Sequence, residues 1–567
     1  MGGKIKLLGE PAILDDSGKS QSVRGHQAWA VLARTLLSRV PIDRRSLAAE
    51  VFPEAADPLG ALRWCLASLR KALNMSDCLR GDPIECNLLS GFDVDVLQIE
   101  QDSFDLNEAA SLLGHIEPRA SAEFATWLLI ERERISGIID ARLRRETLRA
   151  LSLDNPAKAV ELAQMAVRRD AFNESAHVLL VKSLALGGNY EGALAHVDAT
   201  ERFFVSELGE KPSPALRSAA RRTISAPAAG IPMAAFVTSL IQSGLAALSA
   251  GAVDAGLDCL RRAVHDAEKI KDKPLLAKAT LELGTALVHA VRGFDDEGAV
   301  ILRQSSELAR QVGSAQIAAS AYRELGYVEA LAGRRPAAAT YLAEALQCGE
   351  GRDNLAGIHA VIGFNLVDWG RESEGLEHYR LSLEYARSVG NRRREIWALG
   401  LGAWGLLAGD RLKDADIWLE NCLALVDEQR WVSFRPWPVA VLGQSKLRQN
   451  HPPESLRQNL EEAYALSCQV ADPCWEAAVA RTLALTHAAA RDFSSAATWL
   501  GEARKRCFRN TDGYAALEVE ILASQVEVSL SQGRSDLADA FGREWIALAA
   551  RTHMDKHVAR AAAFIAR

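Results

Sequence analysis

Residues 57–74 read Asp57-Pro58-Leu59-Gly60-Ala61-Leu62-Arg63-Trp64-Cys65-Leu66-Ala67-Ser68-Leu69-Arg70-Lys71-Ala72-Leu73-Asn74. On a helix of about 3.6 residues per turn, four leucines form one narrow stripe, at Leu62, Leu66, Leu69 and Leu73. Asp57 can cap this helix, and Pro58 takes a first-turn position where its missing N–H costs nothing. The stretch therefore predicts an amphipathic helix over 58–74 with one buried face.

The other side of this helix is small, aromatic and cationic. It carries Gly60, Trp64, Ala67 and Lys71, with Arg63 and Arg70 beside them. Because the major groove of DNA admits an α-helix, we interpret 58–74 as the recognition helix of a winged helix-turn-helix. The alternative is an ordinary amphipathic helix whose cations face solvent.

Length and composition limit the class of protein. A chain of 567 residues is too long for one core, so we expect roughly three or four folded units. Strand-favouring residues are sparse after the first hundred positions, which predicts a mainly α fold. The net charge is −7, so any DNA-binding surface must be local.

Neither a secretory signal nor a membrane-spanning stretch is evident, so we expect a cytoplasmic protein without membrane contact. The nine cysteines are scattered without a Cys-x-x-Cys pair or a nearby histidine cluster. We interpret them as reduced, mostly buried thiols, and we expect no metal and no cofactor.

The first hundred residues predict an α+β domain. Short strands are expected over 4–8 and 12–14, helices over 23–37 and 43–52, and a hairpin from 84–88 and 92–96. Strands, three helices and a final hairpin are the order of a winged helix with an extra N-terminal sheet. We place this domain at 1–100.

Several short motifs then occur in a fixed order over the first 222 residues. They are Arg24-Gly25-x-x-Ala28-Trp29-Ala30, Asp57-Pro58-Leu59-Gly60-Ala61-Leu62-Arg63-Trp64, Leu69-Arg70-Lys71-Ala72-Leu73, Phe124-x-x-Trp127-Leu128, Ala159-x-x-x-Ala163, Gly188-Asn189-Tyr190-Glu191-Gly192-Ala193-Leu194 and Glu207-Leu208-Gly209-Glu210-Lys211-Pro212-Ser213-Pro214-Ala215-Leu216. With them, residues 1–100 resemble the OmpR-type winged helix of SARP-class regulators, and 101–222 resemble the bacterial transcriptional activator domain of that class.

This resemblance implies residue roles and partners. Arg63, Trp64 and Ser68 would meet base edges, while Arg70 and Lys71 would lie near the DNA backbone. An Arg fork pairs well with guanine, but Trp64 could either touch a thymine methyl or cover a neighbouring domain. The class also implies binding to direct repeats near a promoter, dimers on double-stranded DNA, and recruitment of RNA polymerase.

The charges favour contact through the helices. Arg44 and Arg45 begin the helix before the key one, where cations and free N–H groups suit a phosphate, although a solvated surface is the alternative. The hairpin region instead carries Asp77, Asp82, Glu85, Asp93 and Asp95 against Arg80. Such a wing would be repelled by a minor groove.

The remaining chain is expected to be helical. Asn155-Pro156 and Gly187-Gly188-Asn189 break the helices of 101–222, and residues 223–235 form a linker. From 236 to 567, turn residues recur about every 40 positions, which predicts a tetratricopeptide-like α-solenoid of eight helix pairs. These turn residues are Gly251, Gly293, Gly333, Gly370, Gly409, Asn450, Asp492 and Gly533.

Nine of the twelve tryptophans lie in this solenoid, between Trp369 and Trp545. They could simply fill the spaces between helices. The alternative hypothesis is an aromatic pocket, with Trp404 and Trp437, that binds a peptide, a protein segment or a small molecule as a signal, with arginines such as Arg393 holding an anion.

Catalytic motifs are missing from the sequence. Residues 400–405 match the dinucleotide pattern GxGxxG, but without a preceding strand, so we interpret these glycines as close helix contacts. We therefore expect no catalytic residues and no enzyme. The sequence favours a bacterial DNA-binding transcriptional regulator, and the resemblance to SARP-class regulators implies an activator. A protein-interaction scaffold whose winged helix no longer binds DNA is the alternative.

Overall fold

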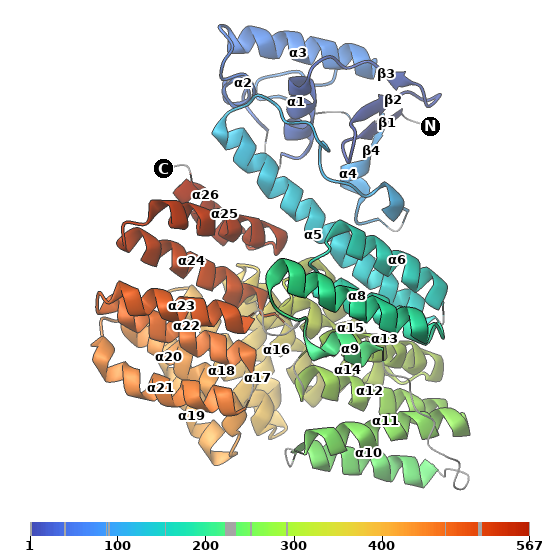
Figure 1. Ribbon diagram of the computed structural model, residues 1–567, viewed down its shortest axis with the longest axis vertical. Helices are drawn as coiled ribbons and strands as arrows, with labels where there is room; N and C mark the ends of the chain where they lie inside the picture. The colour runs from blue at the N-terminus through green and yellow to red at the C-terminus, as the bar shows by residue number, and fades with distance from the viewer. Residues whose placement is uncertain are drawn as a thin grey trace. The chain divides into compact units, whose positions relative to one another are not determined.

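A computed structural model describes residues 3–38, 41–86, 88, 91–101, 103–153, 155–220, 234–249, 252–290, 293–470, 472–507 and 513–565. The chain is mainly α-helical, with a small mixed sheet near its N-terminus and a long array of helical repeats after it (Figure 1). The predicted fold class, mainly α with an N-terminal α+β part, is confirmed at this level.

The small sheet has four short strands in the order β3-β2-β1-β4. They are β1 (Gly3–Lys6), β2 (Ala12–Leu14), β3 (Ser20–Gln21) and β4 (Phe92–Val94). β1 and β2 pair antiparallel, with Ile5 opposite Ile13, as the sequence predicted. β4 pairs with β1 in parallel, so the end of the N-terminal domain returns to its beginning.

Three helices follow this N-terminal hairpin and pack against one another. They are α1 (His26–Leu36), α2 (Arg44–Val51) and α3 (Pro58–Leu73). The predicted cap is confirmed, because Asp57 accepts a hydrogen bond from the Gly60 backbone N–H at 2.8 Å, and Asp43 caps α2 in the same way by accepting one from the Ser46 N–H at 2.9 Å. All three helices therefore lie where the sequence placed them.

The predicted hairpin of 84–88 with 92–96 is wrong for the described residues. Ile84 bridges to Ile42 instead, and the chain at 92–94 pairs with β1. At Asp95 the strand gives way to α4 (Asp95–Gln98), because the Asp95 carboxylate is buried and accepts hydrogen bonds from the backbone N–H groups of Leu7 and Leu8. Positions 87, 89 and 90 lie outside the described residues.

The next segment is helical, as predicted. It contains α5 (Ala122–Ser152), α6 (Pro156–Arg169), α7 (Glu174–Leu186), α8 (Tyr190–Leu208) and α9 (Pro214–Ala219). Both predicted breaks are confirmed, since the side chains of Asn155 and Asn189 cap α6 and α8. Most of the predicted linker 223–235 lies outside the described residues, and α10 begins at Ala234.

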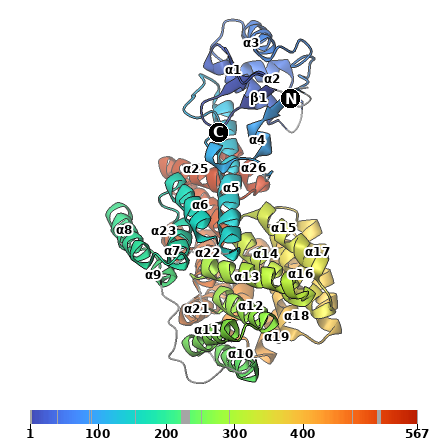
Figure 2. The same cartoon turned by 90° about the vertical axis from the view of Figure 1, so that its right-hand side faces the viewer.

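The array consists of helices joined by tight turns. The helices are α10 (Ala234–Ser249), α11 (Val253–Ile270), α12 (Lys273–His289), α13 (Asp295–Val312), α14 (Ala315–Leu331), α15 (Arg335–Cys348), α16 (Arg352–Asp368), α17 (Glu372–Ser388), α18 (Arg392–Ala408), α19 (Leu412–Glu428), α20 (Pro436–Arg448), α21 (Pro453–Gln469), α22 (Pro473–Ala489), α23 (Phe493–Cys507), α24 (Ala515–Ser531), α25 (Ser535–Arg551) and α26 (Asp555–Ile565). The described helices α10 to α25 form the eight predicted pairs, which follow one another from green to red in Figure 1 and Figure 2.

The predicted turn residues separate the two helices of each pair. Gly333, Gly370 and Gly533 have positive φ, as does Asn450, which explains why glycine or asparagine recurs there. The first of the predicted positions, Gly251, lies outside the described residues. Consecutive first helices, such as α14 and α16 or α16 and α18, also contact each other and form one layer of the array.

Glycines inside the helices bring the two members of a pair close together. A Cβ on Gly244 would lie 2.9 Å from Leu260, and one on Gly326 would lie 2.7 Å from Leu342. Within the GxGxxG match, which lies inside α18, a Cβ on Gly402 would lie 2.5 Å from the Trp418 ring of α19. These glycines therefore serve close packing, and the interpretation of that motif as helix contacts is confirmed.

The contacts divide the chain into two compact units. One contains residues 1–142, 546–551 and 557–567, and the other contains residues 143–545 and 552–556. The first unit therefore extends beyond residue 100 and includes part of α5 and the end of the chain. Within it, Arg551 forms an ion pair with Asp140 of α5 at 2.6 Å.

Membrane-spanning helices and metal sites were searched for among the described residues. None of the helices in the described ranges is long and apolar enough to cross a membrane. In the same ranges, no group of three or more His, Cys, Asp or Glu residues is placed to hold a metal ion. All nine cysteines are free thiols, and five of them are buried.

The buried stripe of α3 gives a test of the N-terminal fold. Leu66→Ala should lower the free energy of unfolding by about 2–5 kcal/mol, because Leu66 is 0% exposed and its removal leaves a cavity. Leu97→Ala is the matched control, since Leu97 is 41% exposed, and we expect a change within about 0.5 kcal/mol. Chemical denaturation measures both, and equal losses would contradict the assignment of the buried face.

A pair of histidines in the array is expected to lower its stability in acid. The Nδ1 atoms of His359 and His378 lie 2.8 Å apart between α16 and α17. Burial and then the neighbouring His378 lower the pKa of His359 from 6.5 to about 4. The folded chain thus binds fewer protons than the unfolded chain between these values, so stability is present above pH 6.5 and is lost as the pH falls.

We therefore expect the melting temperature of His359→Gln to depend less on pH than that of the parent between pH 7 and pH 5. Circular dichroism at constant ionic strength measures both slopes. His451→Gln is the control, because His451 is exposed and should leave the slope unchanged. Identical slopes for the parent and His359→Gln would show that this pair is not the acid-sensitive element.

Candidate functional site

One face of α3 is anchored in the N-terminal core. Leu62, Leu66, Leu69 and Leu73 are between 0 and 2% exposed, and α3 contacts both α1 and α2. The predicted stripe is therefore confirmed. Burial of four leucines fixes the rotation of α3 about its axis, and this rotation decides which side chains face outward.

The outward face of α3 contains most of the residues predicted to meet DNA. Trp64 is 63% exposed, and Arg63 and Lys71 are also exposed. Ser68 and Arg70 are half-buried beside them, and the Arg70 guanidinium donates a hydrogen bond to the Leu66 carbonyl at 3.1 Å. The structure thus brings all five residues to one side of one helix.

Arg63 has a weak internal partner. One of its terminal nitrogens lies 3.5 Å from the Asp57 carboxylate, and the two side chains are 66% and 68% exposed. An exposed ion pair of this kind contributes little to stability. Arg63 can therefore leave Asp57 for another acceptor at small cost.

The start of α2 is less open than the sequence suggested. The Arg44 backbone N–H donates to the Asp82 carboxylate at 2.9 Å, and the Arg44 side chain donates to the Gly81 carbonyl at 2.7 Å. The Asp43 carboxylate accepts a hydrogen bond from the Ser46 backbone N–H. Two carboxylates thus already accept from the helix N-terminus, and Arg45 is the more exposed of the two arginines.

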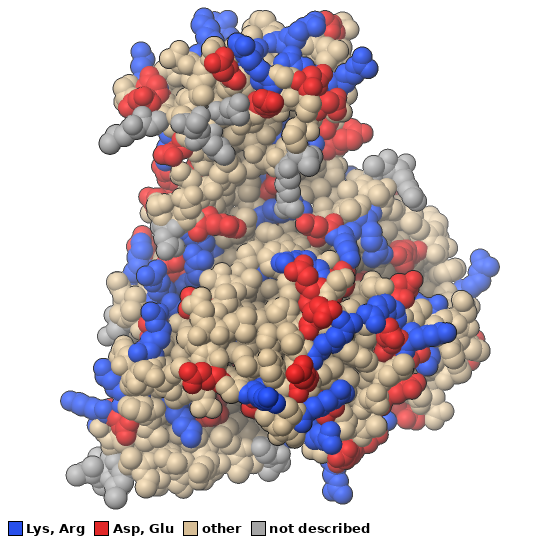
Figure 3. Space-filling model, turned by 180° about the vertical axis from the view of Figure 1, so that it is seen from behind, with Lys and Arg blue, Asp and Glu red and all other residues tan. Residues whose placement is uncertain are grey.

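The acidic side chains that follow α3 in the sequence do not all lie on the surface. Asp95 is 3% exposed and bonded to backbone N–H groups, so it adds no charge to the surface. Asp77, Asp82, Glu85 and Asp93 are exposed. Figure 3 shows Lys and Arg side chains along much of the upper edge of the first unit, with Asp and Glu side chains among and below them.

The residues predicted to bind a signal are separated in the array. Trp437 is 1% exposed, and its indole N–H donates to the Gly400 carbonyl at 2.9 Å. Trp404 is half-buried beside it, with ring centroids 5.7 Å apart. Arg393 lies elsewhere, with its guanidinium 5.1 Å from the Trp431 ring. The structure therefore joins the two tryptophans but not Arg393.

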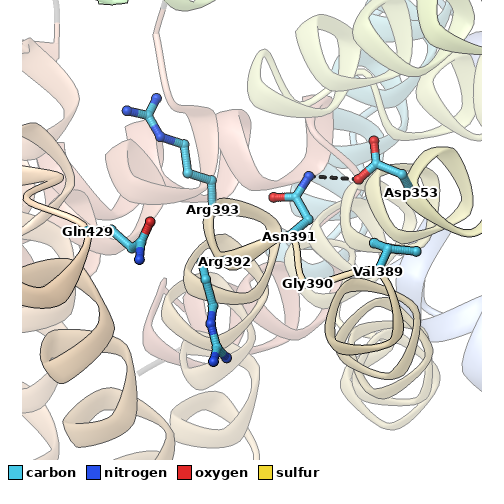
Figure 4. Close-up of a pocket in the computed structure, with 7 residues that line it drawn as sticks. All are labelled: Asp353, Val389, Gly390, Asn391, Arg392, Arg393 and Gln429. Atoms are coloured by element: carbon cyan, nitrogen blue, oxygen red, sulfur yellow. Dashed lines mark hydrogen bonds between the residues drawn. The ribbon is translucent and has the colours of Figure 1, made fainter.

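Arg393 instead lines a pocket at the turns of the array, with a volume of about 480 Å³ (Figure 4). Asn391 donates to the Asp353 carboxylate across one side of it at 2.7 Å. Arg392 and Arg393 point in different directions, and Arg392 pairs with Glu395 at 2.8 Å. Arg393 is therefore the cation of this pocket that remains available beside an aromatic ring.

A second polar group in the array was missed by the sequence reasoning. Arg323 and Glu324 lie in the middle of α14 and are 8% and 3% exposed. Nε2 of His289 donates a hydrogen bond to the Glu324 carboxylate at 2.7 Å. The available signal was an Arg-Glu pair inside a helix whose other central positions are almost all apolar, because such charges stay buried only when they are paired.

Comparison with known proteins finds matches among solved structures alone. No protein-family model and no curated protein sequence matches the chain. Among solved structures, the chain is similar to a Rap protein complexed with Competence and Sporulation Factor, at 13% identity over 59% of this chain and 96% of that one, with a TM-score of 0.43.

Two further solved structures are similar to the chain at equally low identity. The apo form of the quorum sensor NprR from B. thuringiensis is 12% identical over 64% of this chain and 97% of that one, with a TM-score of 0.38. A STAND protein with a tetratricopeptide repeat sensor, from Pyrococcus horikoshii, is 12% identical over 78% and 72%, with a TM-score of 0.36. We draw no functional conclusion from similarities at this level.

The exposed Trp64 and the buried Trp437 should contribute differently to stability. Trp437→Ala should cost about 3–5 kcal/mol of unfolding free energy, because it removes a fully packed ring. Trp64→Ala should change it by less than about 0.5 kcal/mol, because that ring faces solvent. Denaturant titrations of both variants test this, and an unaffected Trp437→Ala would return Trp437 to the ligand-binding candidates.

Proposed function

We propose that the chain is a DNA-binding transcriptional regulator that recognises promoter DNA through α3 and receives a signal through its helical array. The observation that supports DNA binding best is the outward face of α3, where Arg63, Trp64 and Lys71 are exposed on a helix held by four buried leucines. No step of this function is catalytic.

The dimensions and chemistry of α3 suit a major groove. The helix runs for 16 residues from Pro58 to Leu73 and presents one polar side over this length. An Arg fork such as that of Arg63 can donate two hydrogen bonds to guanine. Lys71 and Arg70, in the last turn, would lie beside phosphates and fix the position of the helix.

The resemblance to SARP-class regulators supports the remaining parts of the proposal. What supports it is the order of the elements, since the three helices α1 to α3 precede the helical segment α5 to α9 that would be the bacterial transcriptional activator domain. On this basis the protein would act in the cytoplasm, bind direct repeats as a dimer and help recruit RNA polymerase. The order of the domains, 1–100, 101–222 and 236–567, belongs to the same proposal.

A protein-interaction scaffold is the second candidate, and Trp64 favours it. A tryptophan that is 63% exposed is a common anchor of protein interfaces. The exposed carboxylates Asp77, Asp82 and Glu85 near α3 would also disfavour a phosphate backbone. In this case α3 would dock on a protein, and DNA affinity would be absent.

Two substitutions on α3 distinguish base recognition from phosphate contact. We expect Arg63→Ala to lose the preference for one sequence, with a penalty of about 1–3 kcal/mol at the affected base. We expect Lys71→Ala to weaken binding to every sequence. It should also reduce the slope of log affinity against log salt concentration by about one. Fluorescence anisotropy with the full chain at two salt concentrations measures both effects.

The operator must first be found by selection of random double-stranded DNA on the full chain. Enrichment of a repeated motif, with affinity that falls as salt rises, is the expected result. If no motif is enriched and binding is weak even at low salt, the DNA proposal fails and the scaffold candidate stands. If Arg63→Ala keeps the parent's sequence preference, base recognition by Arg63 is wrong.

A further inference from the structure

Two arginines from different repeats meet over one glycine of the array. Arg323 lies on α14, Arg394 on α18 and Gly357 on α16 between them. A Cβ on Gly357 would lie 2.8 Å from Cζ of Arg394 and 3.1 Å from Cδ of Arg323. The absence of a side chain at Gly357 therefore makes room for both cations on the same side of α16.

The hydrogen bonds of the two arginines differ. Arg323 donates to the Glu324 carboxylate at 2.8 Å and to the Asn354 side-chain oxygen at 3.4 Å. Within the described ranges, the Arg394 guanidinium donates no hydrogen bond. The positive charge of Arg323, followed by burial, lowers the pKa of Arg394 to about 10. Arg394 is thus a cation that lies beside a like charge without an acceptor of its own.

Asn354 adds an independent sign of a missing acceptor. It is 7% exposed, and its side-chain nitrogen is fully buried without a hydrogen-bond partner. A buried amide donor without an acceptor costs free energy comparable to a lost hydrogen bond. Arg394, Arg323 and Asn354 therefore form a group of donors, hereafter the donor cluster, with more donors than acceptors.

Aromatic side chains continue from the donor cluster along the same three helices. Tyr327, Phe364 and Trp397 lie one to two turns from it, with ring centroids 5.8 to 6.2 Å apart. Trp397 is half-buried, whereas Tyr327 and Phe364 are 6% and 3% exposed. A charged group and an apolar group of one ligand could thus be held side by side.

We propose that the donor cluster binds a carboxylate, and that the ligand carries an apolar or aromatic group beside this carboxylate, against Trp397. The inference rests on the proposed role of the array as the receiver of a signal. A planar carboxylate accepts two parallel hydrogen bonds from a guanidinium. Glu324 and Glu282 lie near the cluster and would repel a doubly charged phosphate more strongly than a singly charged carboxylate.

The carboxylate could belong to the end of a peptide or to a small organic acid, and affinity selection distinguishes these sources. The full chain is exposed to three pools: random octapeptides without Asp or Glu that have a free C-terminal carboxylate, the same octapeptides with a C-terminal amide, and a panel of aryl and alkyl carboxylic acids. Mass spectrometry identifies what is retained. We expect retention from the first or the third pool and none from the amidated pool.

Variants then assign the retained compounds to the donor cluster by titration calorimetry. Arg394→Gln should weaken binding at least about tenfold, because it removes a charge-assisted hydrogen bond. Gly357→Ala should also weaken binding, since it displaces Arg394 without removing a charge. Arg380→Gln is the matched control, because Arg380 is exposed on α17 and pairs with Glu377, and it should bind as the parent does.

The result that overturns the proposal is retention of the amidated pool equal to that of the free acids, no retention from any pool, or parental affinity in Arg394→Gln. Melting curves of each variant identify loss of fold, and Arg394→Lys, which keeps the charge, should bind more tightly than Arg394→Gln. None of these measurements involves DNA. Failure here is therefore distinct from failure of the DNA proposal.

Discussion

The close crossing of the two helices in each pair is the constraint on which the array depends. Inside the first helices, glycines stand where a side chain would meet the second helix, and a Cβ on Gly363 would lie 2.9 Å from the Tyr379 ring. The first helices also have a side that faces the next pair, as α14 does toward α16. These sides are buried only when the next pair stacks on them, so the array is stable as a stack rather than as separate pairs.

Close packing also determines where charges can be buried. Arg144 of α5 is 6% exposed and pairs with Glu329 of α14 at 3.0 Å and with Asp296 of α13. Burial would raise the pKa of Glu329, but Arg334 and Arg144 hold it below its ordinary value. The end of α5 is therefore tied to α13 and α14 by ionised groups. The same helix α14 carries Arg323, so one helix serves both the donor cluster and the contact with α5.

Local chemistry accounts for the parts of the fold that the sequence predicted. Asp57 and Pro58 define the start of α3 by a cap and a fixed φ, and the four leucines follow a helical period, so neither depends on distant contacts. The turns at Gly333 and Gly370 likewise follow from their own backbone conformation. The hairpin at 84–96 failed because alternating residues show a strand but not its partner, and β1 from the other end of the domain provided it.

The candidate sites likewise divide into residues that one helix relates along the sequence and residues that come together from different repeats. The outward face of α3 could be predicted from residues 58–74 alone, because the helical period places Arg63, Trp64 and Lys71 outside the leucine stripe. The packing of the repeats was needed to show that Trp437 is buried, that Arg393 lies apart from it, and that Arg323 and Arg394 meet over Gly357. The physical reason is that a helix period relates residues three or four positions apart, whereas these contacts join residues of different repeats and depend on how closely the helices cross.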